Sequence, residues 1–353
     1  MVCDGIVRED IVRAWTSFVR GKEARNDVRV FAWDLEANLE QLYQDLVSGR
    51  YRHGSYRIFT RCDPKPRMIA VPSVRDQVVH HAIVQTIGPA FERRFHPHSY
   101  ASRPGKGVLA GVEAVHRWIR EVSDGGRTRA WALRMDVRRY FASVDHAILT
   151  TLIARQKRGQ TLYATGSDPF SVGEPWLDLC RRVVGSFGEV RGDRKYGIPL
   201  GNLTSQLFAN IYLHELDGFV AHTLHVRRYA RYMDDAVLVG GDRDVLTTYA
   251  AQCRVFLRDV LHLEVPEEKT SITPVHRGVD WLGYVLFPHH RVLRPVTLRR
   301  MRDRIRSRTF AYLDDGLPRE RFRATVASYD GMLCHAHHEQ ERERLALLDR
   351  CVG

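Results

Sequence analysis

The stretch VRRYARYMDDAVLVG, Val226–Gly240, places two adjacent carboxylates between apolar, β-favouring residues. This pattern predicts a hairpin that enters through Arg231–Met233, turns at Asp234–Asp235 and leaves as the buried strand Ala236–Val239. Two neighbouring acids between apolar strands repel each other. A hard cation such as Mg²⁺ relieves that repulsion, because it binds carboxylate oxygens and leaves positions for phosphates. A polar hairpin tip with two solvated aspartates is the alternative interpretation.

Composition narrows the classes of protein to which the chain can belong. Its 353 residues, 44% hydrophobic and 27% charged, are enough for two or three subdomains around a sizeable core. The net charge of +12 suits a polyanionic partner such as a nucleic acid. The sequence has no apolar run of membrane-spanning length, no signal-peptide pattern and no CxxC pair among its cysteines. We therefore expect a cytoplasmic protein without a membrane partner.

A third acidic residue, Asp136, ends the segment WALRMD, in which side chains alternate as in a half-buried strand. A lone aspartate after a strand commonly caps a helix, so Asp136 taken alone has two interpretations. Its order in the chain favours a catalytic role, because the paired acids Asp234 and Asp235 follow further along.

Six short motifs follow one another along the chain. They are KPR…VP (65–72), SYASRPG (99–105), DVRRYF (136–141), GIPLGNLTSQ (197–206), YMDD (232–235) and WLGY (281–284). This ordered set, which covers about residues 51–338, resembles reverse transcriptases of the group II intron-like prokaryotic type. The resemblance implies an RNA-directed DNA polymerase of the α+β class. It also implies a right-hand fold, with an antiparallel palm sheet backed by helices.

The resemblance gives the acidic residues their roles. Asp136, Asp234 and Asp235 would be the palm carboxylates that hold two Mg²⁺ ions, with Mn²⁺ as a substitute. One ion would activate the primer 3′-hydroxyl and the other would hold the triphosphate, and both would stabilise in-line displacement. Whether Asp235 binds a metal or only supports Asp234 by its charge stays open.

Basic residues near the first motif are candidates for triphosphate binding. Lys65, Arg67 and Arg75 could face one way across a hairpin formed by residues 56–60 and 67–72, where Lys and Arg would meet phosphate oxygens. A solvated basic face is the alternative. The resemblance favours contact with the incoming nucleotide.

Three further residues take their roles from the resemblance. Phe141 matches the steric gate, an aromatic ring that excludes the 2′-hydroxyl of a ribonucleotide; a core phenylalanine beside Tyr140 is the alternative. Lys269 would lie near the triphosphate and protonate the leaving pyrophosphate, although in the sequence it is equally an exposed lysine. Gly283 falls in the motif that resembles the primer grip.

The motif GIPLGNLTSQ departs from the common family pattern, in which Gln precedes the second Gly. Here Leu200 precedes Gly201, and Gln206 follows Ser205. This variant resembles the reverse transcriptases of diversity-generating retroelements, where the aliphatic residue is associated with error-prone copying of template adenines. Leu200 offers only van der Waals contact where Gln would form hydrogen bonds, so pair geometry would be controlled less tightly.

Periodicity and the resemblance together give the expected organisation. Residues 1–50 would form an N-terminal helical extension, residues 74–95 a helix, and residues 203–216 a helix capped by Asn202. Fingers would comprise 51–88 and 146–201, the palm 89–145 and 202–290, and the thumb 291–353. The thumb would begin with a basic helix whose apolar face is formed by Leu298, Met301, Ile305 and Phe310.

The expected partners are template RNA, primer and cDNA, deoxynucleoside triphosphates and, by resemblance, an oligomer of a small basic accessory protein. Two alternatives remain open. One is a phage-defence or other group II-like reverse transcriptase, and some phage-defence enzymes polymerise without a template. The other is an inactive RNA-binding scaffold. The sequence does not give the cognate RNA, the target gene, the priming mode or the oligomeric state.

Overall fold

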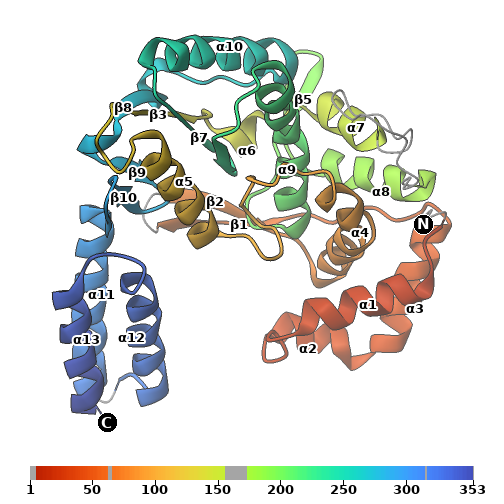
Figure 1. The fold of residues 1–353 in the computed structure, drawn as a ribbon. Helices are drawn as coiled ribbons and strands as arrows, with labels where there is room; N and C mark the ends of the chain where they lie inside the picture. Colours follow the sequence, from red (N-terminus) through yellow and green to blue (C-terminus); the bar gives the residue numbers. More distant parts are fainter. Residues whose placement is uncertain (1–4, 63–65, 156–172, 315, 353) are drawn as a thin grey trace. The chain divides into compact units, whose positions relative to one another are not determined.

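The computed structural model describes residues 5–62, 66–155, 173–314 and 316–352, which form helices and antiparallel sheets (Figure 1). The chain divides into two compact units, each built from three separate segments. Unit 1 comprises Met1–Arg103, Asp136–Val226 and Gln252–Lys269, and unit 2 comprises Pro104–Met135, Arg227–Ala251 and Thr270–Gly353. The α+β class is as expected. The fingers, palm and thumb boundaries stay predictions.

Unit 1 begins with helices, as the sequence predicts. They are α1 (Arg8–Val19), α2 (Asn26–Trp33), α3 (Leu35–Val47) and α4 (Val74–Glu92). The predicted apolar face of α4 is buried along its length, and α4 packs against α1. The side chain of Ser73 accepts a hydrogen bond from the Asp76 amide and thereby caps α4.

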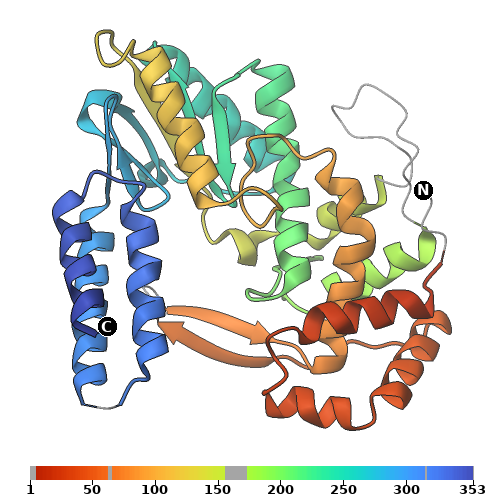
Figure 2. The ribbon, with the colours of Figure 1, turned by 60° about the horizontal axis from the view of Figure 1, so that its bottom comes forward.

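Between α3 and α4 the chain forms a two-stranded antiparallel ribbon, visible in Figure 2. Strand β1 (Arg57–Cys62) pairs with β2 (Pro66–Val71), and Ile58 lies opposite Ala70. This confirms the predicted strand pair. Most of the ribbon is exposed, and only the C-terminal end of β2 is buried.

The remainder of unit 1 surrounds one central helix, α9 (Leu203–Gly218), whose residues are buried almost throughout. The other elements here are α6 (Tyr140–Ser143), α7 (His146–Arg155), α8 (Glu174–Gly185), β4 (Glu189–Arg191), β5 (Arg194–Tyr196), the π-helical turn η2 (Phe219–Thr223) and η3 (Glu267–Lys269). Helices α4 and α7 pack against α9. Asn202 occupies the N-cap position as predicted, but its side chain forms no capping hydrogen bond, so that part of the prediction is wrong.

Unit 2 contains a four-stranded sheet in the order β6-β7-β3-β8. Its strands are β6 (Tyr229–Tyr232), β7 (Asp235–Gly240), β3 (Trp131–Asp136) and β8 (Thr270–Pro274). Helix α5 (Val108–Val122) packs against β6 and β7 through an apolar face that contains Val112, Val115 and Ile119. Helix α10 (Arg243–Leu261) begins in unit 2 and ends in unit 1.

A second sheet of unit 2 has the strands β9 (Val279–Trp281), β10 (Tyr284–Leu286) and β11 (Arg291–Leu293), preceded by the short helix η4 (Val275–Arg277). The run DWLGYVLFP, residues 280–288, thus contains the turn of a hairpin. Leu282 and Gly283 both have positive φ, 48° and 90°. Two such residues in succession suit a type I′ turn, which reverses the chain tightly.

The C-terminal part of unit 2 consists of α11 (Pro295–Leu313), α12 (Arg319–Leu333) and α13 (Glu339–Val352), which run side by side in Figure 2. Met301 and Ile305 of α11 are buried as predicted. Phe310 is 61% exposed, so its predicted place on the buried face is wrong. Phe310 follows Ile305 by five residues, which rotates its side chain by about 140° around the helix and away from the face formed by Met301 and Ile305.

Candidate active site

The YMDD segment forms the predicted hairpin, with a turn one residue earlier than expected. Tyr232 pairs with Asp235 as the last rung between β6 and β7, so the turn is Met233–Asp234. Met233 has a φ of 55°, in the left-handed region that favours glycine. The fully buried guanidinium of Arg231 donates a hydrogen bond to the Met233 carbonyl at 2.9 Å. This bond stabilises the turn in which Met233 adopts its positive φ.

The second acid of the motif is held by an arginine that the sequence motifs did not single out. Arg134 of β3 donates from Nε to Oδ1 of Asp235 at 2.9 Å and from Nη2 to Oδ2 at 2.6 Å. Such a two-pronged contact fixes the orientation of the carboxylate as well as its position. The strand alternation contained a signal for this contact, because it places Arg134 and Asp136 on the same face of the strand.

The acid at the end of β3 is also paired with a base. Lys269 Nζ lies 2.8 Å from Asp136 Oδ2 and 3.1 Å from the carbonyl oxygen of Val137. Both side chains remain about one third exposed, at 35% each. Lys269, predicted to act near the triphosphate, is therefore beside one of the predicted metal ligands.

The carboxylates suit a hard divalent cation by their chemistry. Arg134 and Asp136 are two residues apart on β3, so they share a face and are separated by about 7 Å along the strand. Among the described residues, no group of three or more His, Cys, Asp or Glu is arranged to hold a metal. Asp136 and Asp235 instead engage basic side chains. Carboxylate oxygens are suitable ligands for Mg²⁺, provided that the basic side chain paired with them moves away.

The GIPLG segment packs against the end of the β1–β2 ribbon. The carbonyl oxygen of Leu200 accepts a hydrogen bond from the Ala70 amide at 3.1 Å. Gly201 has a φ of 105°, and a Cβ atom there would lie 3.0 Å from Cγ2 of Ile69. Leu200 and Gly201 are thus fixed beside β2, whereas Gln206 is exposed on the first turn of α9.

Phe141 is joined to the same segment through the backbone. Its carbonyl oxygen accepts a hydrogen bond from the Ile198 amide at 2.8 Å, and the Gly197 amide donates to the carbonyl of Val144 at 2.8 Å. The half-buried ring of Phe141 lies edge-on to Tyr140, with 5.5 Å between the ring centroids. The DVRRYF and GIPLG motifs therefore form one local arrangement.

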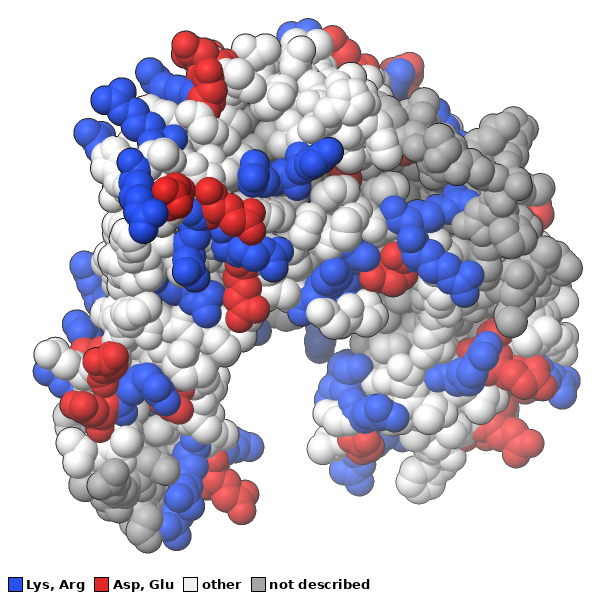
Figure 3. All heavy atoms as spheres, viewed as in Figure 1, with Lys and Arg blue, Asp and Glu red and all other residues white. Residues whose placement is uncertain are grey.

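The three basic residues predicted to bind the triphosphate do not share one local environment. Lys65 lies outside the described residues, and Arg67 is exposed on β2. Arg75 donates from Nη2 to Asp45 Oδ2 at 2.8 Å, and its guanidinium lies over the Tyr51 ring. On the face in Figure 3, Lys and Arg are interspersed with Asp and Glu, so the positive charge is not gathered into one patch there.

A buried polar cluster next to α9 has no counterpart among the sequence predictions. His80 contacts Thr204 Oγ1 through Nδ1 at 2.9 Å and His53 through Nε2 at 3.0 Å. Burial lowers the pKa of His80 to about 3, so its ring stays neutral. Nearby, Tyr51 donates a hydrogen bond to Asp76 at 2.7 Å. No sequence signal distinguishes these residues from ordinary polar surface positions.

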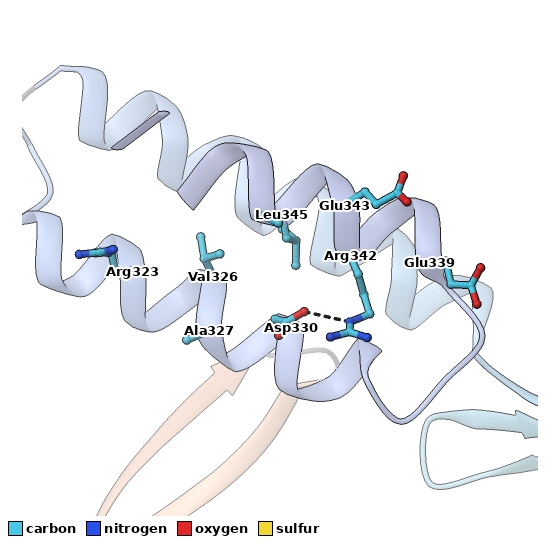
Figure 4. Close-up of a pocket in the computed structure, with 9 residues that line it drawn as sticks. Arg323, Val326, Ala327, Asp330, Glu339, Arg342, Glu343 and Leu345 are labelled. Atoms are coloured by element: carbon cyan, nitrogen blue, oxygen red, sulfur yellow. Dashed lines mark hydrogen bonds and ion pairs between the residues drawn. The ribbon is translucent and has the colours of Figure 1, made fainter. Parts of the chain in front are cut away.

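A groove of about 630 Å³ lies between α12 and α13, well separated in sequence from the acidic motifs. Figure 4 shows its lining residues, with Arg342 paired to Asp330 across the two helices. The lining contains none of the predicted site residues. The primer-grip candidate Gly283 lies elsewhere in unit 2, where its carbonyl accepts a hydrogen bond from the Arg294 amide at 2.9 Å.

The family model and the most similar curated proteins that we compared agree on one family. The model of the family described as "Reverse transcriptase (RNA-dependent DNA polymerase)" matches residues 62–286. Protein YkfC of Escherichia coli is 26% identical over 71% of this chain and 72% of its own length. The group II intron-encoded protein LtrA of Lactococcus lactis is 23% identical over 75% of this chain, which spans only 51% of LtrA.

Among solved structures, an apo telomerase from Candida tropicalis aligns with a TM-score of 0.48 and 13% identity, over 68% of this chain and 55% of that chain. Among the described residues, no helix is long and apolar enough to cross a membrane.

Proposed function

The chain belongs to the reverse transcriptase family, and on that premise we propose that it copies RNA into DNA by two-metal-ion nucleotidyl transfer. Family membership carries with it the right-hand polymerase fold, template RNA as a partner and a general need for divalent metal ions. The proposal adds that the ions are Mg²⁺ and that Asp136, Asp234 and Asp235 form the acidic centre. Bound there, the ions would stabilise the charge that develops during displacement.

The observation that carries this assignment is the arrangement on β3. One strand supplies Arg134, which binds Asp235 of the YMDD hairpin, and ends two residues later at Asp136. Acids from two motifs that are distant in sequence are therefore linked through one strand. In the proposed mechanism Lys269 leaves Asp136 for the triphosphate, where its ammonium group supplies positive charge and a proton for the leaving pyrophosphate.

We assign nucleotide selection to the segment that joins the DVRRYF and GIPLG motifs. Phe141 would exclude the 2′-hydroxyl group, while Leu200, Gly201 and Gln206 would lie along the nascent base pair. The backbone bond between Ile198 and Phe141 supports this assignment, because it fixes both motifs relative to each other. Lys65, Arg67 and Arg75 would contact the triphosphate, and Gly283 the primer. For Arg75 this requires release from Asp45.

We further propose that the enzyme serves a diversity-generating retroelement and makes errors at template adenines. Leu200 in place of Gln supports this subtype, because its side chain cannot form hydrogen bonds to the pair. An oligomeric, small basic accessory protein would then bind the enzyme and its RNA. The fingers, palm and thumb would have the boundaries given above. A phage-defence reverse transcriptase is the second candidate, since it shares the same catalytic motifs.

A sequenced primer-extension assay tests the proposal. Purified protein is given Mg²⁺, an RNA template of mixed composition and all four deoxynucleotides, and errors are counted for each template base. Asp234→Asn should reduce synthesis about a hundredfold or more, because a metal ligand loses its charge. Asp259→Asn is the matched control, since that exposed aspartate forms an ion pair with its neighbour Arg258 on α10, outside the acidic motifs.

The outcomes separate the candidates. Errors concentrated at adenine support the diversity-generating subtype, whereas accurate cDNA indicates a reverse transcriptase of another subtype. Product made without template RNA favours a defence enzyme. Near wild-type synthesis by Asp234→Asn would contradict the catalytic assignment. A wild-type protein that binds RNA but stays inactive with the accessory protein and cognate RNA would be a scaffold.

A further inference from the structure

The carboxylate of Asp235 is one end of a chain of alternating charges in unit 2. Arg134 holds both of its oxygens, and Nη1 of the same guanidinium lies 3.9 Å from Oδ1 of Asp280 on β9. Asp280 in turn accepts a hydrogen bond from Nη2 of Arg294. The order of charges is therefore acid, base, acid, base. Each member comes from a different element.

The far end of the chain is the start of a helix. Arg294 is the N-cap residue of α11, and its backbone amide donates to the carbonyl of Gly283 in the β9–β10 turn. The four residues thus connect the YMDD hairpin to the β9–β10 hairpin and to the N-cap of α11. A displacement of α11 at this end would move a partner of Asp280, which faces Arg134.

Other ion pairs of the same unit lack this geometry. Arg228 and Arg117 each approach Glu121 through a single contact, at 3.7 Å and 3.8 Å, from exposed positions. Such pairs contribute little, because solvent screens them and the side chains remain mobile. The single contact between Arg134 and Asp280, at 3.9 Å, is also partly exposed, but Asp280 is held in place by its hydrogen bond from Arg294. The contact between Arg134 and Asp235 uses two parallel hydrogen bonds, and only 19% of the Asp235 side chain is exposed. It therefore fixes an orientation that an exposed pair does not.

We propose that Arg134 is a positioning residue, which aims the YMDD turn through Asp235 and couples that turn to the start of α11 through Asp280 and Arg294. The inference rests on the proposed function, in which Asp234 is a metal ligand. With both of its oxygens held by Arg134, Asp235 anchors the turn beside the proposed metal ligand Asp234.

Substitutions of Arg134 separate its charge from its geometry. Arg134→Gln removes the positive charge and the pair of parallel hydrogen bonds to Asp235. Arg134→Lys keeps the charge but cannot form both of these hydrogen bonds. Arg228→Gln is the control, because it loses the same charge in the same unit from a single exposed contact. Three quantities are measured for each variant. They are kcat and KM for deoxynucleotide in primer extension, and the dissociation constant of Mn²⁺ without substrate, by electron paramagnetic resonance.

For Arg134→Gln the proposal predicts opposite changes in kcat and in Mn²⁺ affinity. Arg134→Gln should lower kcat about tenfold or more, with little change in KM, because the turn loses its orientation. The same variant should bind Mn²⁺ about threefold more tightly or better, because a positive charge near the acids is gone. Arg134→Lys should keep the wild-type Mn²⁺ affinity and still lose kcat. A merely structural role would weaken metal binding and activity together.

Asp280→Asn tests the coupling and keeps the inference testable if Arg134→Gln fails to fold. It should lower kcat severalfold, and combining it with Arg134→Lys should cost less than the product of the two single effects. Wild-type kcat in Arg134→Gln, or equal losses in Arg228→Gln, would overturn the proposal. If the wild-type protein makes no cDNA, the proposed function fails. Unchanged Mn²⁺ affinity in Arg134→Gln would then overturn this inference as well.

Discussion

Replacing Gly201 with alanine should disturb the junction between the GIPLG segment and β2. The φ of Gly201 is 105°, a conformation that residues with a Cβ rarely adopt. The added Cβ would also lie 3.0 Å from Cγ2 of Ile69, so that side chain must shift. Backbone strain of this kind costs about 1–3 kcal/mol. The unfolded chain becomes stiffer, which offsets about 0.4–1 kcal/mol of that cost.

Two other glycines separate these contributions. Gly185 has no positive φ and no atom within 4 Å of the position that an added Cβ would occupy, so alanine there should be neutral or slightly stabilising. Gly192 has a φ of 65° and equally open space. Its substitution should cost only the backbone strain, about 1 kcal/mol before the offset. The expected order of unfolding free energies is therefore Gly185→Ala highest, Gly192→Ala intermediate and Gly201→Ala lowest.

Urea unfolding followed by circular dichroism measures these differences. The midpoint should decrease in the stated order, with the slope unchanged if the unfolded states are alike. Gly201→Ala should also lower primer extension more than Gly192→Ala does, because Leu200 precedes the strained residue. Equal midpoints for the Gly185 and Gly201 variants would refute the reasoning, since they would show that neither the φ nor the contact with Ile69 matters.

Three further predictions concern specificity and pH. Phe141→Ala should admit ribonucleotides, and an unchanged ratio of kcat/KM for ribo- and deoxynucleotides would mean that the gate lies elsewhere. Leu200→Gln should raise fidelity at template adenines, because the amide adds hydrogen bonds to the pair; an unaltered error spectrum in sequenced cDNA would remove Leu200 from the account. Burial holds the pKa of His80 at about 3, below the ordinary value of 6.5, so between these pH values the unfolded chain binds a proton that the folded chain does not. The unfolding free energy should therefore fall as the pH falls from 6.5 towards 3, and His80→Gln should make that slope shallower in urea titrations; an identical slope would contradict the assignment.

The fold was predictable where a local pattern determines the structure. The apolar residues of α4 recur with the helical period and are buried; they are Val78, Val79, Ala82, Ile83 and Ile87. The turn of the YMDD hairpin was misplaced by one residue, because the positive φ of Met233 is not typical of methionine. The turn within DWLGYVLFP could not be predicted from the sequence for a related reason. Its β-favouring residues do not reveal that Leu282 also adopts a positive φ.

The motifs predicted which residues belong to the candidate site. They did not predict the contacts that those residues form. Asp136, Asp235 and Lys269 were identified from the resemblance, but neither the contact of Lys269 with Asp136 nor the role of Arg134 as partner of Asp235 was predicted. The partner of Arg75, Asp45, lies on α3, and no sequence spacing relates the two. A residue on one element meets a residue on another only after tertiary packing fixes their positions.

Arg134 shows where a sequence-based argument could have gone further. A guanidinium within a half-buried strand needs an acidic or carbonyl partner, because burying an unpaired charge is costly. The alternation of the strand already directs Arg134 to the face of Asp136. The partner is nevertheless 101 positions away, on the neighbouring strand β7. The sequence therefore indicates that Arg134 must be paired, whereas the strand order of the sheet decides that Asp235 is the residue that pairs with it.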